Sequence, residues 1–180
     1  MRKYLGFDPG LRTPTVVIVR EDGTLEDVQR LPTLLLKEDA SPARVAERLV
    51  LITTGLFELL AKLRPAMWGF EGYSFGSAHK SHEMGELGGV VRYRSYVLSQ
   101  RGAVTFPVVV SPTSLKKFVT GRGNADKVAV AVAVHTLWNF TMPDEHGYDA
   151  AAVAQMIRGL DGAYPGMLAY QTTALSQVSR

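Results

Sequence analysis

The sequence contains no cysteine, so disulfide frameworks, cysteine-ligated zinc sites and thiol nucleophiles are all excluded. No apolar run approaches the roughly 20 residues of a membrane span, and the opening MRKYLGFDPG is too poor in apolar side chains for a signal peptide. Internal repeats, linkers and low-complexity tracts are also lacking. A chain of 180 residues has the size of one ordinary domain. We therefore expect one cytoplasmic domain without a membrane segment, and oxygen-ligated metals stay open.

Charge is unevenly distributed along the chain, although the net charge is only +3. Residues 76–127 contain eight Lys and Arg against three Asp and Glu, a balance of +5, and the remainder holds 12 basic against 14 acidic residues, a balance of −2. A basic stretch beside a more acidic remainder suits a polyanionic substrate held around a divalent cation. A solvated basic face is the alternative explanation.

Runs of apolar, β-branched residues and helix-start signals alternate along the chain. Asp22-Gly23 is typical of a hairpin turn, and Ser41-Pro42 is typical of a helix start. The patterns predict strands at 3–8, 15–20, 25–31, 66–73 and 104–110, and helices at 42–64, 82–101, 111–121, 124–138 and 147–160. This order predicts an α/β protein with a mixed five-stranded sheet flanked by helices. Residues 1–160 form the predicted domain, and 161–180 a tail without a firm pattern.

Two carboxylates occupy unusual places in the predicted strands. Asp8 ends the first strand, directly before Pro9-Gly10, where a side chain can project from the sheet edge. An Asp in this setting also suits a plain turn. Glu71 interrupts the apolar run that contains Trp68 and Phe70. Because a buried unpaired charge costs several kcal/mol, Glu71 must meet a cation, take up a proton or bind a metal, unless it faces solvent.

His146 and Asp149 lie three residues apart, beside the alanine-rich segment 150–157. If the helix has begun by then, both side chains share one face and can address one site. The alternative is that acids simply favour a helix N-terminus, which applies equally to Asp144 and Glu145. The motif is therefore ambiguous by itself.

The constellation is more specific than its parts. LGFDPGLRTP, WGFEGYSF, GELGGVVR, SPTSLKKFVTGRGNADKVAV and HGYDAAAVA resemble, in order and spacing, successive blocks of the RuvC family of Holliday-junction resolvases, over roughly residues 3–160. The resemblance implies an RNase H-like fold and a nuclease that cuts branched DNA. It places Asp8, Glu71, His146 and Asp149 at the four catalytic, metal-binding positions. Two lysines near the scissile phosphate correspond to Lys116 and Lys127.

The chain departs from the family pattern at two places. Many members carry an acid where this chain has His146, so metal charge balance and pH response are expected to differ. The family places an aromatic wedge shortly after the catalytic Glu, and both Tyr73 and Phe75 suit that position. The motifs are compatible with a phage-encoded member acting in the host cytoplasm, and they do not determine the source.

The ligand types and the basic stretch predict the chemistry and the partners. Carboxylate oxygens favour Mg²⁺ or Mn²⁺, two ions of which can activate a water and stabilise the leaving oxygen. Crowded carboxylates should have raised pKa values. Tyr73 or Phe75 could stack on unpaired bases. The candidates for phosphate contacts are Lys80, Arg92, Arg94, Arg101, Lys116, Lys117 and Arg122.

Resolving a four-way junction by symmetric paired nicks requires two sites, which predicts a two-fold homodimer. Tyr93 and Tyr96 in the helix at 82–101 make that helix the candidate interface. The sequence does not indicate whether a branch-migration helicase directs the protein. Two other functions stay open: a ribonuclease of the same fold acting on structured or hybrid RNA, and a non-catalytic junction-binding protein.

Overall fold

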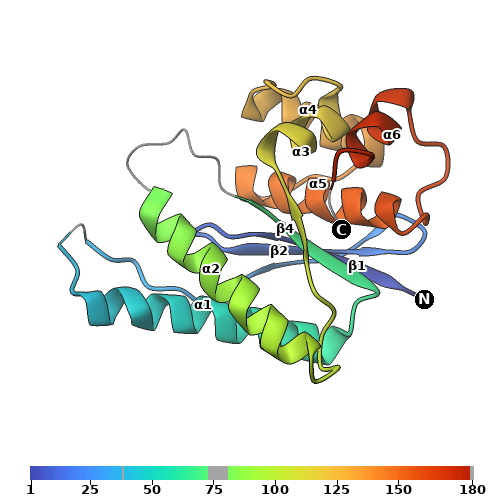
Figure 1. Cartoon of the computed structure of the whole chain (residues 1–180). Coiled ribbons are helices and arrows are strands. Elements are labelled where there is room, and N and C mark those ends of the chain that lie inside the picture. The colour runs from blue at the N-terminus through green and yellow to red at the C-terminus, as the bar shows by residue number, and fades with distance from the viewer. Residues whose placement is uncertain (38, 73–80, 179–180) are drawn as a thin grey trace.

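A computed structural model describes residues 1–37, 39–72 and 81–178 of the chain, without the side chain of Ser81. Five strands form one sheet in the order β3-β2-β1-β4-β5 (Figure 1). β1 pairs antiparallel with β2, which pairs antiparallel with β3, whereas β4 and β5 run parallel to β1. Their bounds are β1 Lys3–Asp8, β2 Thr15–Arg20, β3 Leu25–Arg30, β4 Met67–Glu71 and β5 Val108–Val110. The predicted mixed five-stranded sheet is confirmed.

Helices cover both faces of this sheet. α1 and α2 lie on one face, and α5 lies across the other with α3, α4 and α6 beyond it (Figure 1). Among the described residues, no helix is both long and apolar enough to cross a bilayer. The helix bounds are α1 Pro42–Leu63, α2 Ser81–Ser99, α3 Pro112–Thr120, α4 Lys127–Trp138, α5 Glu145–Leu160 and α6 Ala169–Leu175.

Alternation along β1 feeds two separate hydrophobic cores. Leu5 and Phe7 pack with Trp68 in the core under α1 and α2, whereas Tyr4 belongs to the core around α5. Successive side chains of a strand point to opposite faces, which is why one short strand serves both layers. β1 is thus fixed from both sides up to Asp8.

Gly6 allows α5 to lie close to β1. A Cβ at Gly6 would stand 2.0 Å from the carbonyl oxygen of Ala150 and 2.5 Å from the backbone nitrogen of Ala154. These are backbone atoms of α5, so they cannot turn aside as a flexible side chain would. The first turn of α5 therefore sits directly over the end of β1, which brings residues that are far apart in the sequence to one place.

Most predicted elements lie within a few residues of their expected positions, and three differ. The strand predicted at 104–110 is only Val108–Val110, since residues 101–107 lack strand pairing. The last long helix begins at Glu145 rather than at 147, because the side chain of Asp144 accepts a hydrogen bond from the Gly147 amide and caps it. The tail contains α6, in which Gln171 and Ala174 are buried.

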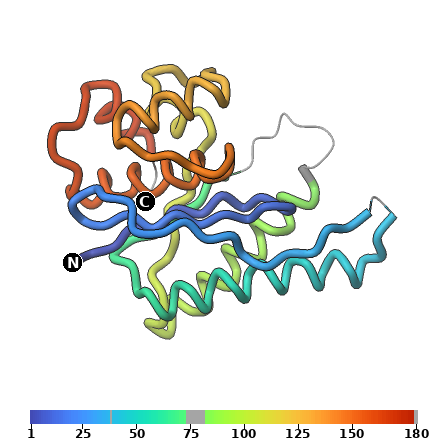
Figure 2. The backbone as a smooth tube through the Cα atoms, turned by 180° about the vertical axis from the view of Figure 1, so that it is seen from behind, coloured from blue at the N-terminus to red at the C-terminus, as the bar shows by residue number. Residues whose placement is uncertain are grey.

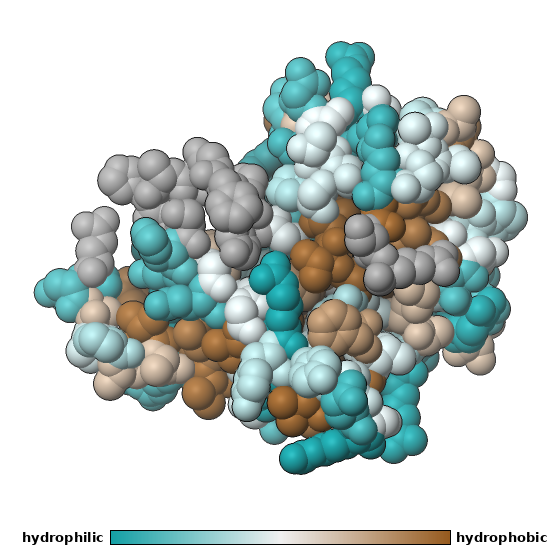
Figure 3. Space-filling view, in the orientation of Figure 1, coloured by the Kyte–Doolittle hydropathy of each residue, from teal (hydrophilic) through white to brown (hydrophobic). Residues whose placement is uncertain are grey.

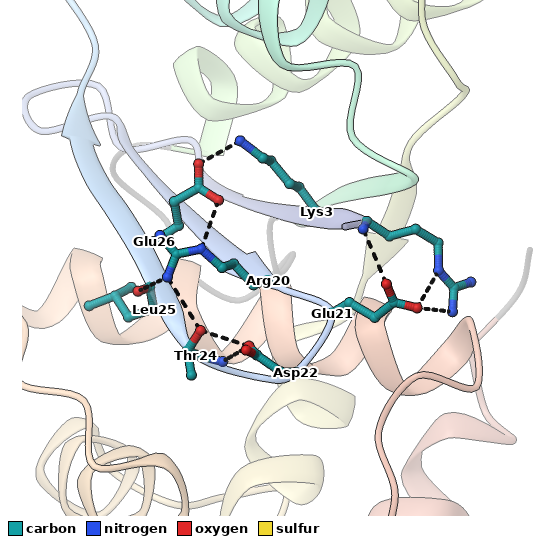
Figure 4. Close-up of polar contacts among 8 residues, drawn as sticks. Lys3, Arg20, Glu21, Asp22, Thr24, Leu25 and Glu26 are labelled. Carbon is teal, nitrogen blue, oxygen red and sulfur yellow. Dashed lines mark hydrogen bonds and ion pairs between the residues drawn. The ribbon is translucent and has the colours of Figure 1, made fainter.

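The amino-terminal end of β1 carries a network of opposite charges (Figure 4). Lys3 pairs with Glu26 at 2.6 Å, and Arg2 pairs with Glu21 at 2.7 Å. Arg2 also reaches Asp161, just after α5, at 2.8 Å. Seen from behind, the segment that follows β3 runs beside α1, away from this network (Figure 2).

Candidate active site

Asp8 and Glu71 end two neighbouring parallel strands. β1 and β4 are registered up to the pair Phe7 and Phe70, so Asp8 and Glu71 are the next residues on each strand. The carboxyl ends of parallel strands meet at the same edge of a sheet, and both carboxylates therefore lie at this edge. Asp8 is 8% exposed, and Glu71 is half-buried.

The first turn of α5 presents His146 and Asp149 to the same edge. Asp144 caps this turn, and its carboxylate also pairs with Arg30 at the end of β3. That pair ties the helix start to the sheet. His146 and Asp149 are one helical turn apart, and Gly10, whose Cβ would lie 3.4 Å from the His146 ring, leaves room for the imidazole.

His146 is bonded directly to Asp8. The Nδ1 of His146 lies 2.6 Å from Oδ2 of Asp8, and because a carboxylate only accepts, Nδ1–H is the donor. This hydrogen bond raises the pKa of His146, with burial acting in the opposite direction. The Nε2 of His146 is left facing Glu145, 3.9 Å from its Oε1. The imidazole therefore links the strand carboxylate to the outer rim of the site.

The acids at this edge hold their protons unusually tightly. Burial, followed by the charges of Asp149 and Asp8, raises the pKa of Glu71 to about 8, although Lys116 and Lys127 act against the rise. Burial and then Asp8 raise the pKa of Asp149 to about 6. The sequence predicted raised pKa values from crowding; both pKa values are raised, but burial is the larger cause and crowding the smaller one. Near neutral pH, Glu71 is mostly protonated in the metal-free protein.

Two lysines approach the acids from α3 and α4. Lys116 and Lys127 both lower the pKa of Glu71, which places their charges near the cluster. Lys127 forms an ion pair with Glu145 at 2.7 Å, and this bond raises the pKa of Lys127 and lowers that of Glu145. Glu145 was not singled out as a functional residue in the sequence, because nothing in DEHGYD indicates a partner on α4.

The chemistry of the donor set fits a hard divalent cation. Carboxylate oxygens are the ligands that Mg²⁺ and Mn²⁺ prefer, and such an ion would favour the ionised forms of Glu71 and Asp149, which burial and neighbouring acids disfavour. As they stand, no three His, Asp or Glu side chains within the described ranges form a group that could hold a metal. The acids are coupled electrostatically but not gathered for coordination, with Asp8 hydrogen-bonded to His146. Metal binding would require these side chains to move closer together.

The residues predicted to contact DNA are not all at this edge. Arg94 packs on the Phe57 ring at 4.9 Å and donates to the Thr53 hydroxyl, so its guanidinium is engaged by α1. Arg92 lies 6.0 Å from the centre of the Phe70 ring. Lys117 lies on α3, while Arg101 and Arg122 are exposed in loops. Tyr73, Phe75 and Lys80 are outside the described residues, and their roles stay predictions.

A groove of about 550 Å³ lies between α3, α4 and α6. Its lining includes Arg122, Asn124 and Tyr170 but none of the four predicted catalytic residues. The acids instead lie at the edge of the sheet, beside the starts of α4 and α5. A long polyanion can be accommodated at such an edge more readily than in an enclosed pocket.

Two parallel strands that end in carboxylates, beneath a helix that carries a further acid, define an α/β protein of RNase H-like fold. The family model for "Crossover junction endodeoxyribonuclease RuvC" matches residues 4–157. The chain belongs to the RuvC family.

Proteins of that name support this assignment. The one from Halorhodospira halophila is 32% identical over 157 residues, which are 86% of this chain and 88% of the relative. The one from Azorhizobium caulinodans is 31% identical over the same shares.

Solved structures share the fold. Thermus thermophilus RuvC superposes with a TM-score of 0.63 at 23% identity, covering 89% of this chain and 96% of that one. T. thermophilus RuvC in complex with Holliday junction substrate superposes at 0.65 with 22% identity, covering 86% and 91%.

Proposed function

We propose that this chain is a structure-selective endodeoxyribonuclease that cuts four-way or otherwise branched DNA in the cytoplasm. The observation that carries the proposal is the meeting of Asp8, Glu71 and Asp149 at one edge of the sheet, with Lys116 and Lys127 beside them. Its relatives are named crossover junction endodeoxyribonucleases. A solved RuvC of the same fold is bound to a Holliday junction.

Asp8, Glu71 and Asp149, with Nε2 of His146, are the residues that would hold Mg²⁺ or Mn²⁺, two ions per site. When bound, the ions supply an activated water and neutralise charge on the phosphate and leaving oxygen. Glu71 would release its proton as the site fills, since a nearby cation favours the carboxylate. His146, fixed by its Nδ1 bond to Asp8, keeps Nε2 available to bind or to accept a proton.

The two lysines contribute charge where the phosphate would lie. Lys116 and Lys127 are close enough to the acids to lower the pKa of Glu71. A phosphodiester beside those acids would meet the same two ammonium groups, which favour an anionic transition state. Lys117 and Arg122 lie near them on α3 and the loop that follows, where they can contact more distant phosphates.

A two-fold homodimer would place two such sites on one junction. The outer stripe of α2 contains Tyr93 and Tyr96, 70% and 59% exposed, and Gly89, whose missing side chain leaves open space. Exposed aromatic residues around a glycine suit close packing of two helices. Hydrophobic surface also lies over α1 in the same layer (Figure 3). We propose that the α2 helices of two subunits pack against each other through the stripe of Gly89, Tyr93 and Tyr96.

Cleavage of matched substrates tests the proposal. Labelled four-way junction, flap, linear duplex and RNA–DNA hybrid are incubated with the protein in Mg²⁺, in Mn²⁺ and in EDTA. We expect cuts at the branch of the junction, in paired positions on two strands, with either metal and none in EDTA. Preferential cutting of the hybrid would assign a ribonuclease instead. Tight junction binding without cuts in either metal would assign a non-catalytic binding protein.

A further inference from the structure

Glu145, which is not one of the candidate catalytic residues, lies between two of them, Lys127 and His146. Its Oε1 is 2.7 Å from Nζ of Lys127 and 3.9 Å from Nε2 of His146. The imidazole in turn donates to Asp8. The 3.9 Å separation is too long for a hydrogen bond, so Glu145 is bonded to Lys127 and only faces His146. The pair of Glu145 and Lys127 joins the start of α5 to the start of α4.

Without a partner such as Glu145, the side chain of Lys127 would be poorly fixed. Lys127 is the first residue of α4, at the helix end where the backbone dipole repels a cation, and its side chain is 62% exposed. A lysine stem is flexible, and fixing it costs conformational entropy. Glu145 is the first residue of α5, where the same dipole favours a carboxylate. The pair therefore has its anion in a favourable place and its cation in an unfavourable one.

We propose that Glu145 is a positioning residue for Lys127: it holds the ammonium group at the rim of the acid cluster, where the scissile phosphate is to lie. The inference rests on the proposed function. An ammonium group has three donors, so Lys127 can keep its bond to Glu145 while it also donates to a phosphate oxygen. Glu145 thereby orients the lysine at some cost in DNA affinity, because its own charge competes with the phosphate.

The exposure of Glu145 predicts how its loss changes stability, DNA binding and turnover. Its side chain is 47% exposed, so the pair is a surface ion pair and contributes little to folding. Loss of the carboxylate should leave the fold intact. Lys127 could then contact any nearby phosphate and would be positioned less accurately at the scissile phosphate. Binding and turnover should then move in opposite directions.

A double-mutant cycle isolates this coupling. Glu145→Gln, Lys127→Gln and the double variant are compared with the wild-type chain. The matched control is Glu58→Gln, an exposed glutamate on α1. One readout is the single-turnover cleavage rate of saturated junction in Mn²⁺. The second is junction affinity in EDTA over a range of salt, which requires no chemistry. Equal melting temperatures verify that the variants fold.

The expected cleavage result is a fall of about tenfold in Glu145→Gln, as for a misplaced catalytic group. In the Lys127→Gln background the same change should have less than about twofold effect, because there is no ammonium left to place. In EDTA, Glu145→Gln should bind about threefold tighter, as expected from losing one surface pair. Lys127→Gln should then weaken binding more in that background than in the wild type, and it should also make the salt dependence of binding shallower by a larger amount there.

Additive effects in both readouts would overturn the positioning role. If the wild type binds but cuts no junction, the proposed function fails, and the cycle in EDTA still decides whether Glu145 restrains Lys127. A junction affinity that is equally sensitive to Lys127→Gln with and without Glu145 would contradict the inference even when cleavage is normal.

Discussion

The charged side chains at the two ends of β1 have different surroundings. At the amino end, Lys3 pairs with Glu26 and Arg2 pairs with Glu21 (Figure 4), and Arg2 also pairs with Asp161. At the carboxyl end, burial, followed by the charges of Asp149 and Asp8, raises the pKa of Glu71 to about 8. One strand thus joins a region of paired charges to a region of buried acids.

This difference separates stability from function. Opposite charges in contact can stabilise the fold slightly, whereas a carboxyl with a raised pKa destabilises it once ionised. Residues that are kept at such a disadvantage cluster at functional sites more often than elsewhere. The carboxyl end of β1 is therefore the part of the described chain where we place the chemistry.

The largest effect should come from the site end. Asp8→Asn and Glu71→Gln are each expected to lower junction cleavage by roughly three orders of magnitude, because a lost ligand removes several kcal/mol of transition-state stabilisation. Junction binding in EDTA should be retained. Glu26→Gln, at the other end of the sheet, should change the cleavage rate by less than about twofold. Near-normal cutting by either site variant would refute the assignment.

The lysines should show a smaller loss, chiefly in turnover. Lys116→Ala and Lys127→Ala are each expected to slow single-turnover cleavage roughly 30-fold, because charge on the reacting phosphate loses its partner. Affinity should fall only about twofold. Titrating junction binding separates the two quantities. Equal losses in affinity and rate, with a shallower salt dependence, would make these lysines plain phosphate contacts.

Stability should respond to pH with a sign set by Glu71. Its folded pKa of about 8 exceeds the ordinary value, so the folded state binds more protons and stability falls as pH rises toward 8. Glu71→Gln removes this penalty, which is about 2 kcal/mol for a half-buried group after solvent screening. In EDTA its melting temperature should exceed the wild type by roughly 5 °C at pH 9. At pH 4.5 the two should nearly coincide.

A constant difference in melting temperature across this range would show that the pKa of Glu71 is not raised by folding. Asp149→Asn offers an independent check, because its folded pKa of about 6 gives the same sign over a narrower window.

The opposite end should behave in the opposite sense. Asp161 accepts from Tyr4 at 2.6 Å and pairs with Arg2, and burial with this bond raises the pKa of Tyr4 to about 12. Asp161→Asn should lower the melting temperature by about 3 °C, the equivalent of roughly 1 kcal/mol. Cleavage at moderate temperature should be unchanged. An unaltered melting temperature would mean that the network contributes nothing to stability.

Much of the fold was predictable because its signals are local. Alternation identifies β1 and β2, and Ser41 and Ser111 cap α1 and α3 as expected from sequence. α6 was not predicted because it is stabilised by contacts with distant parts of the chain and has no local helix signal. Its Tyr170 covers Gly121 at the end of α3, a pairing that no local pattern indicates.

The candidate ligands could be named from the sequence, but their connections could not. Asp8 stood out because it ends a strand and Glu71 because it interrupts an apolar run, and parallel pairing places both at one edge of the sheet. The bond between Lys127 and Glu145 joins two helix starts that are separated in the chain, so it depends on packing. Arg94 was predicted to contact DNA but packs on the Phe57 ring. The sequence does not distinguish a basic residue that faces DNA from one that packs on an aromatic ring.

Proton release on metal binding tests most directly whether the crowded acids form a cation site for cutting DNA. Mn²⁺ is titrated calorimetrically into the protein at pH 7 in two buffers with different heats of ionisation. Because the pKa of Glu71 is about 8, its proton must leave when the carboxylate binds, and we predict that Glu71 releases about one proton per site. Glu71→Gln should release about one proton fewer, and any remaining release comes from the other ligands, such as His146, whose pKa is also raised. Binding without proton release, or equal release in that variant, would contradict the account.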